Sequence, residues 1–437
     1  MRIHDNIHGY IDLDPIATAI VDTDVFQRLR NIHQTGVLYL VFPTANHTRF
    51  EHSIGTYHLA KQMITQIATK QPELKVTDEL IMMVSLAGLC HDMGHLLFSH
   101  LFDDCFLEKL PNYDNIKQST FNWCHENRSI NLLHYIVERD NIPLTKDMLK
   151  VIGDLINPKE SDYNKWKPKY QVGRWIFQIV SNPLNSIDVD KFDYLTRDTM
   201  AVGLKLGFDY SRIISDARVI DTHGSSKICY SSQCSEDIYH MFFIRYRLHR
   251  QIYNHKAVKA IEILIVQILF ELEKEINISS YIMEPEKMLL LVDSFVMNAN
   301  LFSKNEKVKS IISDINMRNL PKMVYQQISL NEIPMNEIVD KIKLDENFKD
   351  KYQIVRFKVG YVGGKKNPLN KIYFYNFKTG MIISENKVKN FSLLINQKHQ
   401  ECFIRIYCLD INIKNELKQF MDIQQNKTDS DENNIEV

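Results

Sequence analysis

The sequence predicts a mainly α-helical protein with a smaller C-terminal α+β region, and two patterns predict this fold class. Apolar residues recur at three- and four-residue steps through most of the first 280 or so of the 437 residues, which is the period of an amphipathic helix. From about Gln353 the sequence changes to short β-branched and aromatic runs with glycine and proline between them, which is typical of strands and turns. Because the chain exceeds the usual size of a single core, we expect a helical domain over 1–282 and an α+β region over 283–425.

The helical period marks a series of segments along the first domain. In the third of them, Thr77 is a good N-cap, and the carboxylates of Asp78 and Glu79 fall in the first turn, where the helix dipole favours them. This segment is apolar on more than one face, so we expect it to be buried. The predicted helices are 24–34, 53–69, 77–91, 129–139 and 236–275.

The C-terminal region contains two predicted strands, 354–359 and 371–375, with three glycines and Pro368 between them. The final run, 426–437, is rich in Asp, Glu, Asn, Ser and Thr and has almost no apolar residues. Such a run cannot offset the entropy of ordering, so we expect a disordered acidic tail.

Composition excludes several classes of protein. The formal net charge of -1 argues against a protein that binds polyanions through bulk electrostatics, so phosphate binding must be local and nucleic acid is not an indicated partner. Seven scattered cysteines without CxxC spacing suit reduced thiols in a cytoplasmic protein, with the nucleus left open. The longest apolar stretches are too short to span a bilayer, so we expect no membrane partner.

The most informative stretch is LAGLCHDMGHLLFSH, residues 86–100, which delivers His91 and Asp92 side by side at the end of the predicted buried helix. An adjacent His-Asp pair can offer an imidazole nitrogen and a carboxylate oxygen to one divalent ion. In isolation such a pair binds metal in roughly one case in ten. His52, one helix upstream, and Asp190, well downstream, complete a predicted set of four metal ligands.

The order of motifs carries a resemblance. Five segments occur in the order RFEHS, HDMGH, FSHLFD, CHEN and NSIDVDKFDYLTRD. In the order of these segments the chain resembles the SAM- and HD-domain-containing deoxynucleoside triphosphate triphosphohydrolases. The likeness begins at HDNIHGY, residues 4–10, continues through YRLHRQIYNHK and returns as KKNPLNKIYFYNF and FIRIYC; it is weakest across 284–350. It implies an HD-domain helical core over 1–282. The chain departs from the family at its start, where it begins directly with the HD core, so we expect no SAM domain.

The resemblance also implies a reaction. Two imidazoles and two carboxylates suit iron, manganese, zinc or magnesium, with Mg²⁺ expected to accompany the nucleotide as well. The ion would polarise an α-phosphate and help to activate water. Water would then attack that phosphorus of a dNTP and release a deoxynucleoside and inorganic triphosphate.

Further residues match the family's catalytic positions. His100 is the expected general acid, oriented by Asp103, while His95 and His125 are expected to contact the phosphates. The alternative for these histidines is helix capping or hydrogen bonding inside the core.

Substrate contacts can be assigned in the same way. Arg49, Lys191 and Arg245 match phosphate-gripping positions, and surface salt bridging is their alternative role. A second group matches residues that hold the 3′-hydroxyl and pack a ring against the deoxyribose, so that a ribose is excluded sterically. Its members are Gln34, Tyr194, Asp198 and Tyr253. The chain departs from the family at two neighbouring positions, where Thr35 stands for a leucine and Asn254 for a glutamine. Asn254 is still expected to bind substrate.

A regulatory site is the remaining implication. In the family, guanine nucleotide and then a dNTP bind between subunits. We therefore expect GTP or dNTP activators as partners. We also expect a homo-oligomer, a dimer or tetramer, in which region 283–425 takes part. The matching positions are Asp22, Gln27 and Arg30 for guanine, and Val41, Phe42, Arg218, His255 and Lys256 for the second activator. Ser231 and Gln233 replace basic residues and His4 replaces an asparagine, so activation is expected to be altered, looser or absent. Helix capping by Asp22 and surface ion pairing by Arg30 remain alternatives.

Two other functions fit parts of these observations. Another HD phosphohydrolase, acting on nucleoside monophosphates or phosphodiesters, would need the metal but not the three phosphate-gripping cations. A non-catalytic nucleotide- or nucleic-acid-binding homologue would be expected to have lost metal ligands. The presence of the cations and of all four ligands favours the triphosphohydrolase.

Overall fold

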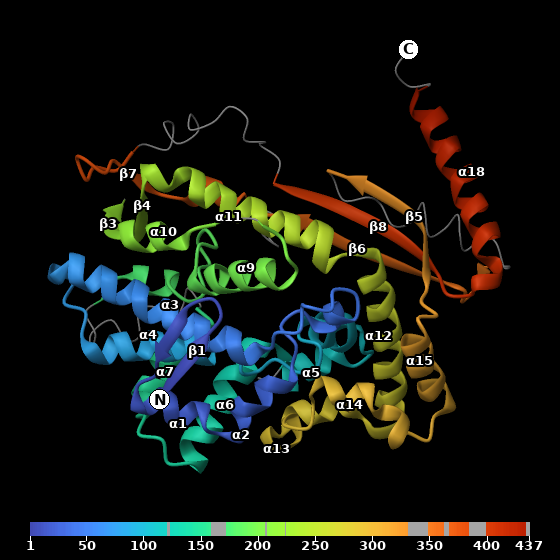
Figure 1. The fold of residues 1–437 in the computed structure, drawn as a ribbon, viewed down its shortest axis with the longest axis horizontal. Coiled ribbons are helices and arrows are strands. Elements are labelled where there is room, and N and C mark those ends of the chain that lie inside the picture. The colour runs from blue at the N-terminus through green and yellow to red at the C-terminus, as the bar shows by residue number, and fades with distance from the viewer. Residues whose placement is uncertain are drawn as a thin grey trace.

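The computed structural model describes residues 1–119, 123–158, 172–205, 208–222, 224–330, 348–361, 367–383 and 399–433, and statements about absent features below refer to these residues. Helices form most of the molecule, and two of the three described sheets lie along one side of the helical body (Figure 1). The predicted class, mainly α with a smaller α+β region, is confirmed. None of the described helices is both long and apolar enough to cross a membrane.

Two helices that pack against each other form the centre of the helical body. Helix α3 (Arg49–Lys70) packs against α4 (Asp78–Cys90), which is buried along nearly its whole length, as its sequence predicts. Gly88 permits this close approach, because a Cβ atom there would lie 2.9 Å from the carbonyl oxygen of Thr56. Helix α9 (Val189–Ala201) covers α3, and α7 (Lys146–Ile156) covers α4.

Two predicted helices are interrupted. The segment 24–34 forms α2 (Asp24–Gln27) and a 3-10 turn, η1 (Arg28–Asn31), because His33 then adopts extended backbone and bridges to Thr48. The segment 236–275 forms α11 (Ser235–Arg247), a π-helical turn η10 (Leu248–Tyr253) and α12 (Lys256–Ile276). The break follows because the His255 side chain accepts from the backbone N–H of Ala257 and starts a new helix.

The sheets join distant parts of the chain. Strands β1 (Arg2–Asp5) and β2 (Gly9–Asp12) form an antiparallel hairpin. Strands β3 (Arg218–Thr222) and β4 (Ser225–Ser231) are antiparallel, and β7 (Phe374–Tyr375) pairs in parallel with β4. In the third sheet, β8 (Gln400–Cys408) lies between β5 (Lys322–Ser329) and β6 (Tyr352–Gly360).

The two strands predicted in the C-terminal region do not pair with each other. The predicted strand 354–359 lies within β6, but the predicted strand 371–375 ends in β7, which pairs with β4 of the first 282 residues. Sequence alternation marks a strand without specifying its partner, and the pairing of β4 with β7 bridges more than 140 residues.

The remaining helices complete the helical body and the C-terminal end. They are α1 (Pro15–Val21), α5 (Tyr113–Ser119), α6 (His125–Arg139), α10 (Tyr210–Asp216), α13 (Pro285–Met288), α14 (Asp293–Met297), α15 (Glu306–Met317) and α18 (Lys414–Asn433). Helix α18 packs on β5 and projects from the body (Figure 1). Its helical backbone includes residues 426–433, where the sequence predicts a disordered tail; residues 434–437 lie outside the described part. The run contains no glycine or proline that would end a helix.

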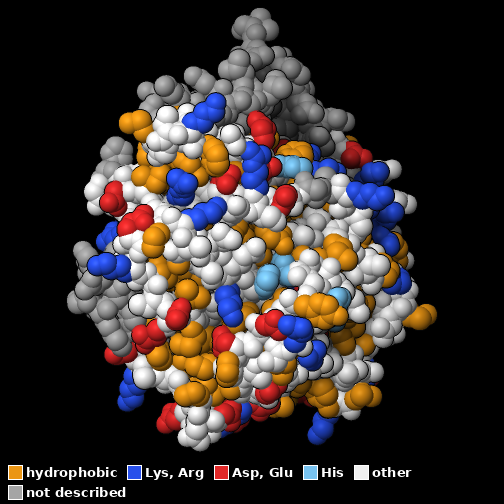
Figure 2. Space-filling view, turned by 60° about the vertical axis from the view of Figure 1, so that its left-hand side comes forward, with side chains coloured by type: hydrophobic (Ala, Val, Ile, Leu, Met, Phe, Trp, Pro, Cys, Tyr) orange, Lys and Arg blue, Asp and Glu red, His pale blue; other side chains and the backbone are white. Residues whose placement is uncertain are grey.

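Charged side chains are spread over the surface. Figure 2 shows acidic and basic side chains intermingled on one face, in keeping with the formal net charge of -1. A strongly charged pole does not form on this face.

Candidate functional site

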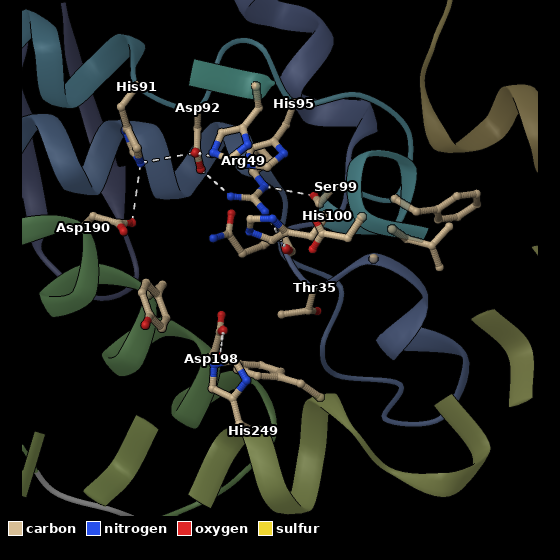
Figure 3. Close-up of a pocket in the computed structure, with 18 of the residues that line it drawn as sticks. Thr35, Arg49, His91, Asp92, His95, Ser99, His100, Asp190, Asp198 and His249 are labelled. Carbon is tan, nitrogen blue, oxygen red and sulfur yellow. Dashed lines mark hydrogen bonds and ion pairs between the residues drawn. The ribbon is translucent and has the colours of Figure 1, made fainter. Parts of the chain in front are cut away.

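Four side chains from separate helices converge on one point. Helix α3 supplies His52, the end of α4 supplies His91 and Asp92, and the first turn of α9 supplies Asp190. The Nε2 atom of His52 lies 3.3 Å from His91 Nε2, 3.1 Å from Asp190 Oδ1 and 3.3 Å from Asp92 Oδ2. The Nε2 atom of His91 lies 3.5 Å from Asp190 Oδ1 and 3.4 Å from Asp92 Oδ1 (Figure 3). Groups this close can share a single cation.

The two imidazoles are oriented by contacts on their other nitrogen. His52 Nδ1 donates to Asp193 Oδ2 at 2.7 Å, and His91 Nδ1 donates to the carbonyl oxygen of Gly88 at 2.8 Å. Both bonds leave Nε2 free to bind a metal, as in known metal sites. Burial alone would raise the pKa of the Asp190 carboxyl, but His52 and His91 hold it well below its usual range. Two imidazole nitrogens and two ionised carboxylates therefore fit a divalent ion.

A cavity of about 660 Å³ opens beside these ligands. This volume suits a ligand of nucleotide size, since small-molecule pockets run from about 300 to 1,000 Å³. Every residue predicted to bind substrate lines the cavity, together with the three predicted catalytic histidines. They are Gln34, Arg49, Lys191, Tyr194, Asp198, Arg245, Tyr253 and Asn254, with His95, His100 and His125.

The three histidines form a compact cluster. The ring of His95 stacks on that of His125, with centroids 4.0 Å apart, and His100 lies edge-on to both. Both ring nitrogens of His95 are buried and have no hydrogen-bond partner among the described residues; Nε2 lies 3.4 Å from Asp92 Oδ1. Burial lowers the pKa of His95 well below its usual value and that of His100 to about 4, and nearby Arg49 and His125 act in the same direction. The core hydrogen bonding considered as an alternative is therefore absent for His95.

The position of Asp103 differs from the prediction. Its carboxylate accepts two bonds from Arg128 Nη2, at 2.6 and 2.8 Å, and lies 3.5 Å from His125 Nδ1. Among the described contacts, it makes no hydrogen bond to His100. The π-helical turn η4 (Leu101–Phe106) places Asp103 beneath α6, which carries both His125 and Arg128.

The predicted phosphate-binding cations are each anchored by one or more contacts. Buried Arg49 pairs with Asp92 and donates to Ser99 Oγ at 3.0 Å. Lys191 Nζ lies 3.1 Å from Asp188 Oδ2. Arg245 Nη1 donates to the carbonyl oxygen of Gly360 in β6 at 2.7 Å, while its buried Nε has no partner in the described structure. Surface salt bridging is thus not the role of Arg49.

Polar side chains face the four candidate metal ligands across the cavity. Asp198 accepts from His47 Nε2 at 2.6 Å and from the hydroxyl of Tyr253. Figure 3 places Asp198 and His249 opposite His91 and Asp92, with Thr35 between. The side-chain oxygens of Gln34 and Thr35 are buried and lack partners among the described residues, so they can bind a polar ligand.

The predicted activator positions fall into separate groups. The side chain of Gln27 donates to the carbonyl oxygen of Val21 and accepts from Arg30 Nε at 2.8 Å. Asp22 follows Val21 and is the C-cap of α1. Arg30 stacks on the Phe50 ring at 3.5 Å instead of forming the ion pair considered as an alternative.

The second activator group is divided. Phe42 contacts the ring of His255 with centroids 5.6 Å apart, next to Val41 and Lys256 in sequence, whereas Arg218 lies on β3, far from α12 (Figure 1). The structure therefore does not bring Arg218 to the other four within one chain.

Sequence reasoning missed several residues that support the site. Asp193 lies behind His52, His8 lies behind Asp193, and His47 holds Asp198. Only Asp193 had a local signal, since it follows Asp190 by three residues and so shares its helix face. The contacts of His8 and His47 join residues more than 150 positions apart.

Comparison with known proteins adds independent findings. The chain matches no protein-family model. It is 32% identical to the deoxynucleoside triphosphate triphosphohydrolase SAMHD1 of Homo sapiens over 94% of this chain and 71% of that protein. It is 34% identical to the SAMHD1 homolog of Dictyostelium discoideum, over 93% of this chain and 77% of that protein. The HD domain-containing protein L394 of Acanthamoeba polyphaga mimivirus is 32% identical over 93% of this chain and 92% of its own length.

Proposed function

Because this chain belongs to the SAMHD1 family of deoxynucleoside triphosphate triphosphohydrolases, we propose that it hydrolyses a dNTP to a deoxynucleoside and inorganic triphosphate in the cavity beside His52, His91, Asp92 and Asp190. The observation that carries this proposal is the convergence of four candidate ligands beside a cavity whose lining includes Arg49, Lys191 and Arg245. A divalent ion held there would polarise the α-phosphate and lower the pKa of an attacking water.

Three cations bind the triphosphate in this proposal. Arg49 lies between the metal ligands and Ser99, so its guanidinium can contact a phosphate oxygen next to the reacting phosphorus. Lys191 and Arg245 carry the remaining charge; each has a single anchoring partner and further N–H groups available. Their anchored positions lower the entropy lost when phosphate binds.

Proton transfer falls to the histidine cluster. His100 donates a proton to the departing 5′ oxygen, while His95 and His125 hold phosphate oxygens. A polyanionic triphosphate beside His100 raises its pKa from about 4, because a nearby opposite charge favours the protonated imidazole. Asp103 positions His125 and not the acid itself, since the carboxylate lies beside that ring.

Product identity is the decisive test of this function. With Mn²⁺ or Mg²⁺, the purified protein is expected to convert dGTP or dTTP into deoxynucleoside and inorganic triphosphate, which chromatography separates. Release of dNMP and pyrophosphate would contradict attack at the α-phosphorus with loss of the whole triphosphate. Turnover of nucleoside monophosphates or phosphodiesters in place of dNTPs would favour the alternative HD phosphohydrolase.

Sugar selection gives a second prediction. We propose that Tyr194 and Tyr253 leave no room for a 2′-hydroxyl and that Gln34 and Asp198 bind the 3′-hydroxyl. Tyr253→Ala opens this wall, so the preference for dGTP over GTP as substrate is expected to fall by about tenfold or more in kcat/KM.

The matched control for this change is Tyr253→Phe. It removes the hydrogen bond to Asp198 but keeps the ring, so it should retain the preference for deoxyribose. A loss of preference in the phenylalanine variant equal to that in the alanine variant would contradict steric exclusion.

We also propose that the chain works as a homo-oligomer that responds to nucleotide activators. Arg218 lies apart from Phe42 and His255, so a nucleotide touching all three would have to bridge two copies. Ser231, which is buried and accepts from the backbone N–H of Gln233, supplies no charge for such a ligand. The expected activation is therefore weaker than one supported by further cations. Region 283–425 contributes β6 beside Arg245, and we retain 1–282 as the proposed catalytic domain.

Activation can be measured directly. Adding GTP is expected to raise dNTP turnover and to shift the oligomer distribution toward larger species in analytical ultracentrifugation. Arg30→Ala should reduce both responses without changing basal turnover. If GTP leaves turnover and assembly of the wild type unchanged, the activator site is absent.

A further inference from the structure

We propose that His8, in the turn of the β1–β2 hairpin, is a positioning residue for the metal centre, acting on the ligand His52 through Asp193. The inference rests on the proposed function, because it requires His52 to bind a metal. His8 lies 44 positions before His52 and outside the cavity lining, so it has no direct contact with a ligand in the cavity. The proposal therefore concerns support of a ligand and not chemistry.

The Asp193 carboxylate joins the two histidines. Its side chain is fully buried, and each oxygen accepts two hydrogen bonds. The Oδ2 atom accepts from His52 Nδ1 at 2.7 Å and from Arg197 Nε at 2.9 Å. The Oδ1 atom accepts from His8 Nε2 at 2.6 Å and from Arg197 Nη2 at 2.9 Å. Four donors fix the carboxylate plane, and that plane sets the orientation of the His52 ring.

No other position of Asp193 is easily available. A Cβ atom at Gly55, one turn along α3 from His52, would lie 1.9 Å from Asp193 Oδ1. The carboxylate thus fills a recess in α3 that only glycine leaves open. It is held in the recess from one side by α9, through Arg197, and from the other side by the hairpin, through His8.

The hairpin is built to present His8. Asp5 accepts from the backbone N–H groups of Ile7 and His8, which orders the turn, and Gly9 follows with a positive φ of 72°. Asp5 also accepts from Arg197 Nη1 at 2.9 Å, so both residues of the turn contact the Asp193 network. His8 Nδ1 accepts from the hydroxyl of Tyr210 at 2.9 Å, which leaves the Nε2 hydrogen for Asp193.

Loss of the His8 donor should lower the affinity of the site for metal. The recess and Arg197 keep Asp193 in place, but one acceptor site of its buried carboxylate is then unpaired. The bond from His52 Nδ1 to this carboxylate is less tightly fixed, so His52 loses part of the constraint that aims Nε2 at the other ligands. Replacing a residue that is hydrogen-bonded to a metal ligand lowers metal affinity by about 10- to 100-fold. His8 is one hydrogen bond farther from the metal than Asp193, so we expect a loss at the lower end, about tenfold. At saturating metal, kcat should return to within about twofold of wild type.

The experiment compares Mn²⁺ binding in matched variants. The dissociation constant for Mn²⁺ alone is measured from the electron paramagnetic resonance signal of the free ion, with circular dichroism to verify folding. His8→Phe keeps an aromatic ring but removes the donor, and about tenfold weaker binding is expected. His8→Gln can place an amide N–H near the position of Nε2 and should restore binding to within about threefold. His33→Phe is the control, since it breaks a His–Asp contact of the same 2.6 Å length, to Asp293, outside the Asp193 network.

The outcomes separate this inference from the proposed function. Unchanged Mn²⁺ affinity in folded His8→Phe, or equal weakening in His33→Phe, would overturn the role of His8 while leaving the metal centre intact. A wild-type protein that binds no Mn²⁺ would overturn both. If His8→Phe does not fold, Tyr210→Phe decides the question, because it removes only the hydroxyl that is hydrogen-bonded to His8 Nδ1. This variant should weaken Mn²⁺ binding by about threefold. An unchanged Mn²⁺ affinity would overturn the proposal.

Discussion

Asp190→Ala is expected to lower dNTP turnover by at least about a thousandfold, because it removes one of four ligands and a charge that the metal needs to stay bound. The Asp190 side chain is 31% exposed and has no structural partner outside the ligand set among the described residues. Its removal should therefore leave the fold intact. Turnover is measured from triphosphate release, and bound metal by elemental analysis of the same sample.

The control for this variant is the same change at an exposed aspartate, Asp221→Ala in β3, which should keep wild-type turnover and metal content. Retention of more than about a tenth of the activity in Asp190→Ala would show that the ligand set is wrongly assigned. Loss of activity with full metal content would instead point to a role for Asp190 in substrate binding.

Gly94→Ala is expected to destabilise the protein by about 3 kcal/mol and to abolish activity. A Cβ atom at this position would lie 2.1 Å from the carbonyl oxygen of His125 and 2.4 Å from the backbone nitrogen of Ser129. The backbone of Gly94 is bonded to the same helix, since it donates to Ser129 Oγ and accepts from Arg128 Nε, both at 2.8 Å. Alanine must therefore push α6 away, and His125 with it.

Urea denaturation followed by circular dichroism measures this effect. The control is Gly153→Ala in α7, where the atoms nearest to the added methyl group belong to the side chain of Ile130, at 3.4 Å or more. Because alanine is the better helix former, this control is expected to be neutral or to gain up to about 1 kcal/mol. Equal stability of the two variants would mean that the close contact of Gly94 with α6 is absent in solution.

The sequence alone predicted the fold class and the residues of the candidate metal site, which the structure brings together. The buried helix ending in His91 and Asp92 was predictable because an all-round apolar run with a threonine cap is a local pattern. The candidate substrate residues could be proposed as a set, because they accompany the motifs that resemble a known family, and all eight line one cavity.

Tertiary packing decided how these residues are supported. Four features had no sufficient signal in the sequence. They are the break at His255, the pairing of β7 with β4, the placement of Asp103 beside Arg128 and His125, and the hydrogen bonds that link His8 through Asp193 to His52. Periodicity reports which face of an element is buried but not what it is buried against. Each of these features depends on partners brought together from different elements. The candidate ligands could therefore be predicted from local motifs, whereas their orientation depends on long-range contacts.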